Sequence, residues 1–177
     1  VRLLDFESRL LEETTAPIAP IVKLVRENGK NKIKISGMAV FKEDRMIGRL
    51  SNEDVPGYIW AMGDVEGGSI KVDTDLGTAV LEITTLDCRR NVTLRQDGGV
   101  RVALDVDATV SIGELGGFRD MTPETLLPYL VRMTQEEIRH EIMSTFQTAQ
   151  NLNADIYELG TSVYRKYPKK WRKMKER

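Results

Sequence analysis

The stretch from Val100 to Ile112 alternates apolar and polar residues more regularly than any other part of the chain. Its apolar members are Val100, Val102, Leu104, Val106, Ala108, Val110 and Ile112, and the residues between them include Arg101, Asp105, Asp107, Thr109 and Ser111. Because successive side chains of a strand point to opposite faces, this pattern predicts a long strand with one buried and one solvated face. Such a strand is typical of an antiparallel sheet.

The same sheet is expected to continue towards the N-terminus. Asp97-Gly98-Gly99 is a hairpin turn signal, and alternating residues precede it from Ser69 onwards. Gly67-Gly68 is predicted to form a loop, and Gly113, Gly116 and Gly117 are predicted to end the long strand. Neither glycine cluster has the sequence context of a phosphate-binding or dinucleotide-binding loop, so both are interpreted as turns.

The other segments predict helices and short strands. We expect a helix over 2–13, a strand over 21–25, strands over 32–41 and 46–50, a helix over 52–62, a long helix that starts at Thr122 and is disturbed near Pro128, and a short helix over 155–164. Segregated strands and helices predict an α+β fold, in which a mostly antiparallel or mixed sheet packs against the long C-terminal helix and the shorter helices. We expect one domain over 1–177, with a lead-in helix and strand in 1–30 and a basic tail in 165–177.

Residue counts exclude several classes of function. The chain of 177 residues carries a net charge of −1, whereas a nucleic-acid binder usually shows a strong basic excess, so we expect no nucleic-acid partner. No apolar run approaches the ~20 residues of a membrane-spanning helix. Cys88 is the only cysteine, which excludes an intramolecular disulfide and a cysteine-based zinc site within one chain.

His140 is the only histidine and lies among Glu136, Glu137 and Glu141. An enzyme of this sequence could place an acid/base site around Glu137, His140 and Glu141. The two-histidine helical zinc signature is absent, and the spacing is typical of a polar helix face. The favoured interpretation is therefore that the protein is not an enzyme and has no catalytic residue, no metal site and no cofactor.

Other chemically active side chains also have simple structural explanations. An acidic cluster suggests calcium but lacks the EF-hand spacing, so it is interpreted as a solvated loop: Asp64, Glu66, Asp73 and Asp75. Asp105 and Asp107 fall on the solvated face of the long strand, where alternation already accounts for them. Cys88 falls within a strand pattern and is expected to be packed and unreactive.

The basic tail, Arg165 to Arg177, carries Trp171 and follows Tyr164. Attraction to an anionic membrane surface would explain it. A charged helix end that interacts favourably with the helix dipole would explain it equally well.

The hairpin Ser36–Leu50 has a glycine in each arm, Gly37 and Gly48, which favours bulges or a close backbone approach. Ser51-Asn52-Glu53-Asp54 follows as a helix start. This region contains three short motifs: Gly37-Met38-Ala39-Val40-Phe41, Gly48-Arg49-Leu50 and Gly57-Tyr58-Ile59-Trp60. Together they resemble the opening of the C-terminal domain of the C subunit of bacterial spore germinant receptors, the Ger(x)C family.

A second segment resembles the same family. The family's Asp-Ile-aromatic-x-aromatic/Leu-Gly signature is similar to Asp155-Ile156-Tyr157-Glu158-Leu159-Gly160. Its basic Pro-Lys-x-Trp segment is similar to Tyr167-Pro168-Lys169-Lys170-Trp171. The resemblance covers most of residues 33–173. It suggests core positions for Phe41 and Ile156 and a helix cap at Asp155, and we expect the two signature segments to pack against each other or against the same sheet.

The resemblance implies a non-enzymatic lipoprotein subunit on the outer face of the spore inner membrane, assembled with an A and a B membrane subunit into a receptor for nutrient-triggered germination. The family's lipid-bearing cysteine and a terminal strand have no counterpart here, and Cys88 lies in the wrong place to be the anchor. The chain begins at Val1 rather than Met, so it is expected to be an excised fragment that lacks the anchor.

Overall fold

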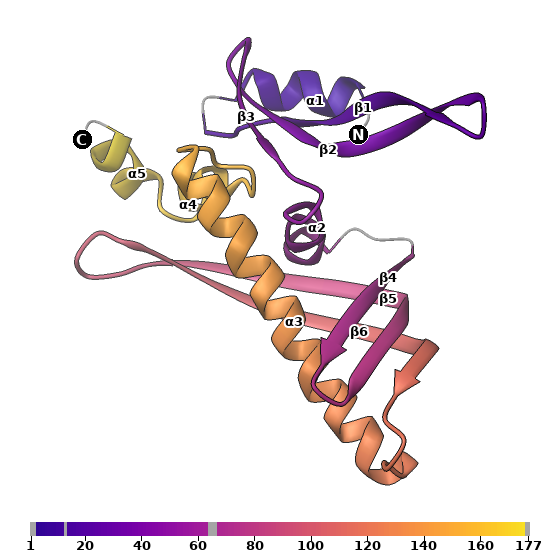
Figure 1. Cartoon of the computed structure of the whole chain (residues 1–177). Coiled ribbons are helices and arrows are strands. Elements are labelled where there is room, and N and C mark those ends of the chain that lie inside the picture. Colours follow the sequence, from indigo (N-terminus) through magenta and orange to yellow (C-terminus); the bar gives the residue numbers. More distant parts are fainter. Residues whose placement is uncertain (1–2, 13, 64–66, 176–177) are drawn as a thin grey trace.

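The computed structural model describes residues 3–12, 14–63 and 67–175. These described residues form two three-stranded antiparallel sheets, one long helix and four short helices, which confirms the α+β prediction (Figure 1). The elements in chain order are α1 (Leu3–Leu10), β1 (Ile18–Glu27), β2 (Lys30–Lys42), β3 (Arg45–Leu50), α2 (Val55–Met62), β4 (Gly68–Thr74), β5 (Gly77–Leu94), β6 (Val100–Gly117), α3 (Pro123–Asn151), α4 (Leu159–Lys166) and α5 (Pro168–Lys175).

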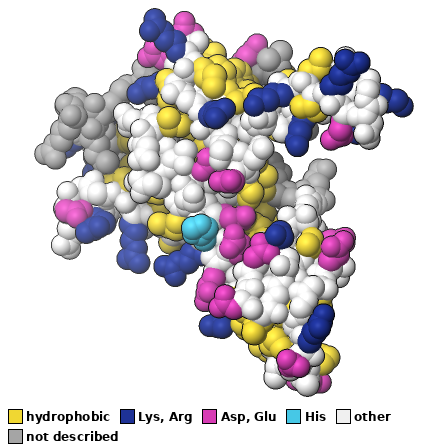
Figure 2. Space-filling view, in the orientation of Figure 1, with side chains coloured by type: hydrophobic (Ala, Val, Ile, Leu, Met, Phe, Trp, Pro, Cys, Tyr) yellow, Lys and Arg dark blue, Asp and Glu magenta, His cyan; other side chains and the backbone are white. Residues whose placement is uncertain are grey.

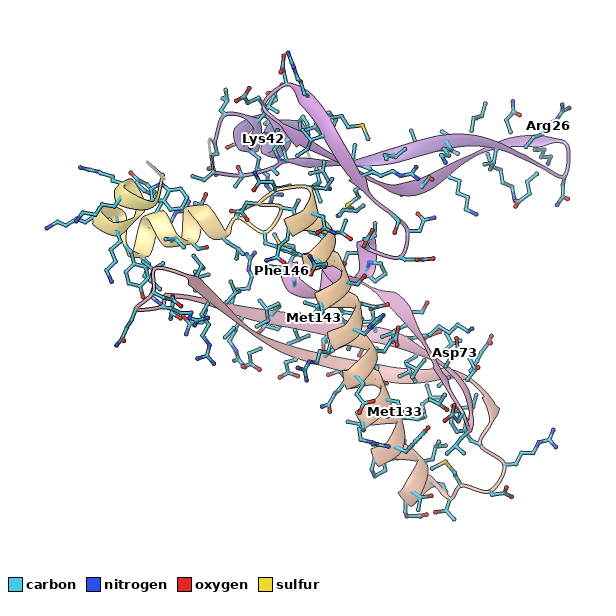
Figure 3. The ribbon with its side chains drawn as sticks, turned by 60° about the vertical axis from the view of Figure 1, so that its left-hand side comes forward. Arg26, Lys42, Asp73, Met133, Met143 and Phe146 are labelled. Carbon is cyan, nitrogen blue, oxygen red and sulfur yellow. The ribbon has the colours of Figure 1, made fainter. Side chains whose placement is uncertain are left out.

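The first sheet has the order β1-β2-β3 and contains the hairpin of the family resemblance. The outer half of the β1–β2 ribbon projects away from the other elements, and Arg26 lies at its end (Figure 3). Four large apolar side chains of this projecting arm are strongly exposed: Val22, Leu24, Ile33 and Ile35.

The second sheet has the order β4-β5-β6, with β5 and β6 each 18 residues long. β6 ends at Gly117, one of the three glycines predicted to end it, whereas Gly113 and Gly116 lie within the strand and are not turns. Val80 pairs with Glu114 and Leu81 pairs with Ile112, so Gly113 is an extra residue opposite β5, and pairing resumes beyond it. A bulge that accommodates one unpaired residue lets the strand continue to Gly117.

Helix α3 is 29 residues long and crosses the second sheet diagonally (Figure 1). Pro128 lies inside it and does not make it restart. Pro128 lacks the N–H that would bond the carbonyl oxygen of Glu124, so the helix continues with one hydrogen bond fewer near its start.

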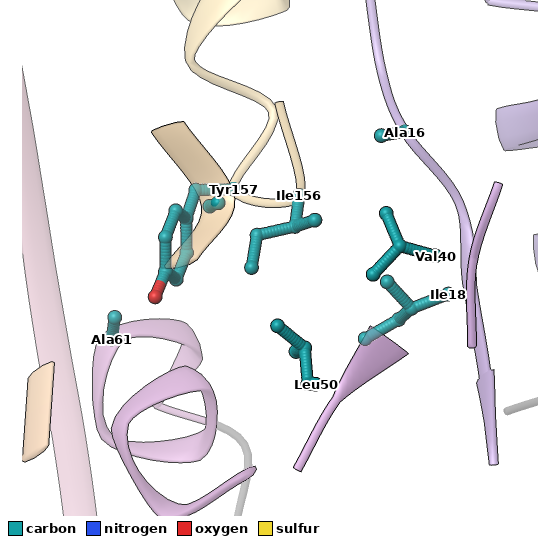
Figure 4. Close-up of a cluster of buried hydrophobic side chains, with 8 residues drawn as sticks. Ala16, Ile18, Val40, Leu50, Ala61, Ile156 and Tyr157 are labelled. Atoms are coloured by element: carbon teal, nitrogen blue, oxygen red, sulfur yellow. The ribbon is translucent and has the colours of Figure 1, made fainter. Parts of the chain in front are cut away.

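Two clusters of buried side chains hold the elements together. The first lies between the β1–β2–β3 sheet and the segment after α3, and includes Val40, Leu50, Ala61, Ile156 and Tyr157 (Figure 4). The second lies between the β4–β5–β6 sheet and α3 and includes Trp60, Ile70, Val72, Ala79, Leu81, Phe118 and Leu130. Helix α2 therefore contributes consecutive residues to both clusters.

Candidate interaction surfaces

The two segments that carry the family resemblance meet in the first cluster. Val40 and Leu50 come from the hairpin, and Ile156 and Tyr157 come from the segment after α3. The ring of Tyr157 stacks between Tyr58, at 5.9 Å between centroids, and Phe146, at 6.1 Å. This confirms the expectation that the two segments pack together.

The hairpin glycines serve sheet geometry rather than ligand binding. Gly37 has φ +88° and lies where β1 and β2 change register, so the bulge needs a residue that adopts positive φ without strain. Gly48 lies beside the register change between β2 and β3 and directly faces the side chain of Leu152.

Asp54 precedes α2 but does not cap it. Its Oδ2 accepts hydrogen bonds from the backbone N–H and the hydroxyl of Ser51, each at 2.8 Å, and its Oδ1 accepts one from the hydroxyl of Thr148 at 2.9 Å. The hydroxyl of Thr145 donates to the Asp54 carbonyl oxygen at 2.6 Å. These bonds join α2 to α3, so this buried carboxylate is a structural link with both oxygens occupied.

Asp155 has a comparable role before α4. Its carboxylate accepts hydrogen bonds from the backbone N–H of Leu159 at 2.9 Å and of Gly160 at 2.6 Å. Asp155 therefore bonds the first two N–H groups of α4, as a cap would, although Glu158 occupies the N-cap position and α4 is not the last helix. The capping also explains why the helix begins at Leu159 instead of Asp155.

The acidic positions considered for catalysis do not form a shared centre. Glu141 accepts a hydrogen bond from the indole N–H of Trp60 at 2.5 Å, and burial raises the pKa of its carboxyl group, an effect that the indole bond partly offsets. His140 is exposed on α3, and no hydrogen bond or ion pair joins it to another described residue. Within the described ranges, no group of three or more His, Cys, Asp or Glu side chains could hold a metal ion.

The other acidic side chains are paired or solvated. Asp64 and Glu66 lie outside the described residues. Asp73 accepts hydrogen bonds from Lys71 and Thr78, which lower the pKa of its carboxyl group. On the exposed face of β6, Asp105 forms an ion pair with Arg89 at 2.9 Å.

Asp107 is exposed on that same face, in agreement with the alternation of the strand. Cys88 is half-buried in β5, where burial raises the pKa of its thiol and keeps it in the unreactive protonated form.

A groove of about 750 Å³ lies between β6 and α3 and is lined mainly by apolar side chains. Leu127, Val131 and Met143 of α3 line it and are each more than half exposed. The outer edge of β6 pairs with no described strand. Sequence periodicity placed Leu127 and Val131 on the sheet-facing stripe of this helix, but it did not predict that both side chains are exposed.

The described residues include no helix with the length and apolar character needed to span a membrane. The described part of the basic tail, 165–175, lies in α4 and α5, and Lys166 of α4 donates to the carbonyl oxygen of Val92 in β5 at 3.0 Å.

The family model and the curated relatives that match this chain are all described as spore germination proteins. The model of the family described as "Spore germination B3/ GerAC like, C-terminal" matches residues 36–177. Spore germination protein KC of Bacillus subtilis (strain 168) is 21% identical over 192 residues, which cover 99% of this chain and 47% of that protein. Putative spore germination protein YfkR of the same organism is 22% identical over 161 residues, which cover 88% of this chain and 42% of that protein.

Among solved structures, the crystal structure of the GerBC protein superposes with a TM-score of 0.78 at 17% identity, covering 99% of this chain and 54% of that one. The two therefore share a fold. The chain spans about half the length of the curated relatives it matches.

Proposed function

Because the chain belongs to the family of spore germination B3/GerAC-like C-terminal domains, we propose that it acts in nutrient-triggered spore germination as a non-enzymatic part of a germinant receptor. Its role there is protein–protein interaction. The observation that carries this proposal is the family match over residues 36–177, supported by a shared fold that extends over nearly the whole chain.

The partners in this proposal are the A and B membrane subunits of the receptor. The complex acts at the outer face of the spore inner membrane, and a lipid anchor outside residues 1–177 attaches the protein there. The arrangement of the acidic side chains supports a binding role, because Asp54 and Glu141 each hold α2 against α3 and Asp155 bonds the first N–H groups of α4.

Deletion of the gene tests the proposal. Spores of the deletion strain are expected to lose germination with at least one nutrient while they germinate normally with a non-nutrient trigger, and a complementing copy should restore the response. Affinity-tagged protein purified from detergent-solubilised spore membranes should retain the A and B subunits. Normal responses across the nutrient panel, together with purification free of both subunits, would overturn the proposal.

The enzyme alternative around Glu137, His140 and Glu141 has a separate test. His140→Ala removes the only imidazole of the chain from an exposed helix position. We expect unchanged folding and wild-type germination rates in the complemented strain, because this exposed side chain forms no hydrogen bond or ion pair with a described residue. Loss of germination by folded protein would revive the enzyme interpretation.

A further inference from the structure

Helices α4 and α5 form the most strongly basic region of the described chain. Between Leu159 and Lys175 there is no Asp or Glu. Six exposed basic side chains, here called the basic corner, lie on the two helices: Arg165, Lys166, Lys169, Lys170, Arg172 and Lys173. None of the six forms an ion pair with a described carboxylate.

Helix dipoles explain only part of this charge. Arg165 and Lys166 occupy the last turn of α4, where positive charge is favourable. Lys169 and Lys170 occupy the first turn of α5, where the same dipole makes positive charge unfavourable. The whole chain has a net charge of −1, yet Lys169 and Lys170 lie where positive charge destabilises the helix. This placement indicates that the positive charge serves a contact with another molecule.

The basic corner is held in place by the second sheet. Lys166 donates hydrogen bonds to Asn91 Oδ1 at 3.1 Å and to the Val92 carbonyl oxygen at 3.0 Å. Figures 1 and 3 both show α4 beside the outer end of the β5–β6 hairpin. Figure 2 shows further Lys and Arg side chains at the lower left, over the outer part of this hairpin and below α4 and α5.

Aromatic side chains interleave with the cations. Lys166 and Lys170 lie over the ring of Tyr167, 5.7 and 5.9 Å from its centroid, and Tyr164 is 52% exposed next to Arg165. Amphipathic aromatic rings among basic residues suit the interface between lipid headgroups and water. Trp171 packs towards Gly160 and is only partly exposed, so it supports the helix pair from within.

We propose that the basic corner binds an anionic lipid surface and so orients the protein with α4 and α5 facing the membrane. This deepens the proposed function, since it supplies a contact with the membrane separate from any lipid anchor. Binding is electrostatic, so it requires anionic headgroups and weakens as salt shortens the range of the attraction.

Sedimentation with lipid vesicles tests the inference. The chain should bind vesicles of phosphatidylglycerol mixed with phosphatidylcholine at low salt, but not vesicles of phosphatidylcholine alone. Each neutralised basic residue should weaken binding about fivefold, so the variant Lys169→Gln/Lys170→Gln/Lys173→Gln should lose on the order of 100-fold.

The matched control is Lys30→Gln/Lys32→Gln/Lys34→Gln on the projecting arm, which changes the net charge equally at exposed positions elsewhere. It should retain most of the binding. Equal losses in the two variants would overturn the proposal, and so would equal binding to both kinds of vesicle. Absence of vesicle binding at low salt would also overturn it and would favour an acidic protein as the partner of the basic corner.

The vesicle assay does not depend on germination. Failure of vesicle binding overturns the membrane contact and leaves the receptor role intact. Normal germination of the deletion strain overturns the receptor role and leaves a positive vesicle result intact.

Discussion

At the residue scale, the close approach of α2 to α3 depends on positions where no larger side chain fits. Gly57 is buried, and a Cβ atom there would overlap the carbonyl oxygen of Glu141 and the hydroxyl of Thr145. That hydroxyl also bonds the carbonyl oxygen of Asp54, and its residue is fully buried. The helix contact and the polar link therefore occupy the same small space.

Gly57→Ala is expected to lower the free energy of unfolding by about 2–3 kcal/mol, because backbone atoms of α3 would have to move to admit the methyl group. Denaturant unfolding followed by circular dichroism measures the change. Gly116→Ala is the matched control, since the nearest atom to its new methyl group is 3.9 Å away and its φ is negative or extended. Equal effects of the two substitutions would contradict this account.

The partly buried carboxyl group of Glu141 is expected to make the stability of the fold depend on pH. Burial raises the pKa of this carboxyl group in the folded protein above its value in the unfolded chain. Its contribution to stability is therefore fully present below the unfolded pKa and is lost as pH rises through the folded pKa. Wild type should lose stability relative to Glu141→Gln as the pH rises from about 4, near the pKa of an unfolded Glu, through the raised pKa of the folded protein.

Thermal unfolding of both proteins across this pH range measures the difference. The amide of the variant keeps an oxygen that can accept the Trp60 indole hydrogen bond, so packing is preserved while the charge is removed. A pH-independent difference between the two proteins would show that burial of the carboxylate has no energetic consequence.

At the element scale, the hairpin β2–β3 and the segment after α3 are distant in sequence but share a core. Ile156 is 1% exposed and contacts the cluster that contains Val40 and Leu50. The N–H of Ala16 also donates to the carbonyl oxygen of Asp155 at 2.9 Å, so the chain leading into β1 is fixed to the same segment.

Ile156→Ala should therefore reduce stability by about 2–5 kcal/mol, the usual range for removing a buried Ile side chain. Ile33→Ala on the exposed arm removes the same atoms, yet it should change stability by less than about 0.5 kcal/mol. Urea titrations of the two variants give both values. A small effect at Ile156 would mean that this junction relaxes to fill the space.

At the scale of the whole molecule, α2 and α3 connect the two sheets. Trp60 belongs to the second cluster and its neighbour Ala61 to the first, while α3 contributes Leu130 to the second and Ala149 to the first. We propose from this sharing that the chain unfolds as a single domain.

Trp60 can report on this cooperativity once Trp171→Phe has removed the other tryptophan. In that background, Ile156→Ala should shift the Trp60 fluorescence transition to the same extent as the circular dichroism transition, because a cooperative domain loses both clusters together. A Trp60 transition that stays in place while the circular dichroism transition moves would show two independently folding units.

The sequence alone determined the elements whose signals are local. Alternation in 100–112 indicated a long strand with one solvated face, and the turn at Asp97–Gly99 indicated its hairpin, because side-chain periodicity reflects the geometry of a single strand. The paired signature segments also indicated the family before any contact was known.

The tertiary structure decided what depends on neighbouring elements. Gly113 becomes a bulge only because β5 continues opposite it, and Asp54 becomes a link only because α3 presents Thr145 and Thr148. The groove beside Leu127 and Val131 exists because α3 crosses the sheet at an angle, which no periodicity encodes. Local patterns specify elements, whereas strand register, hydrogen-bond partners and grooves arise when elements from distant parts of the chain meet.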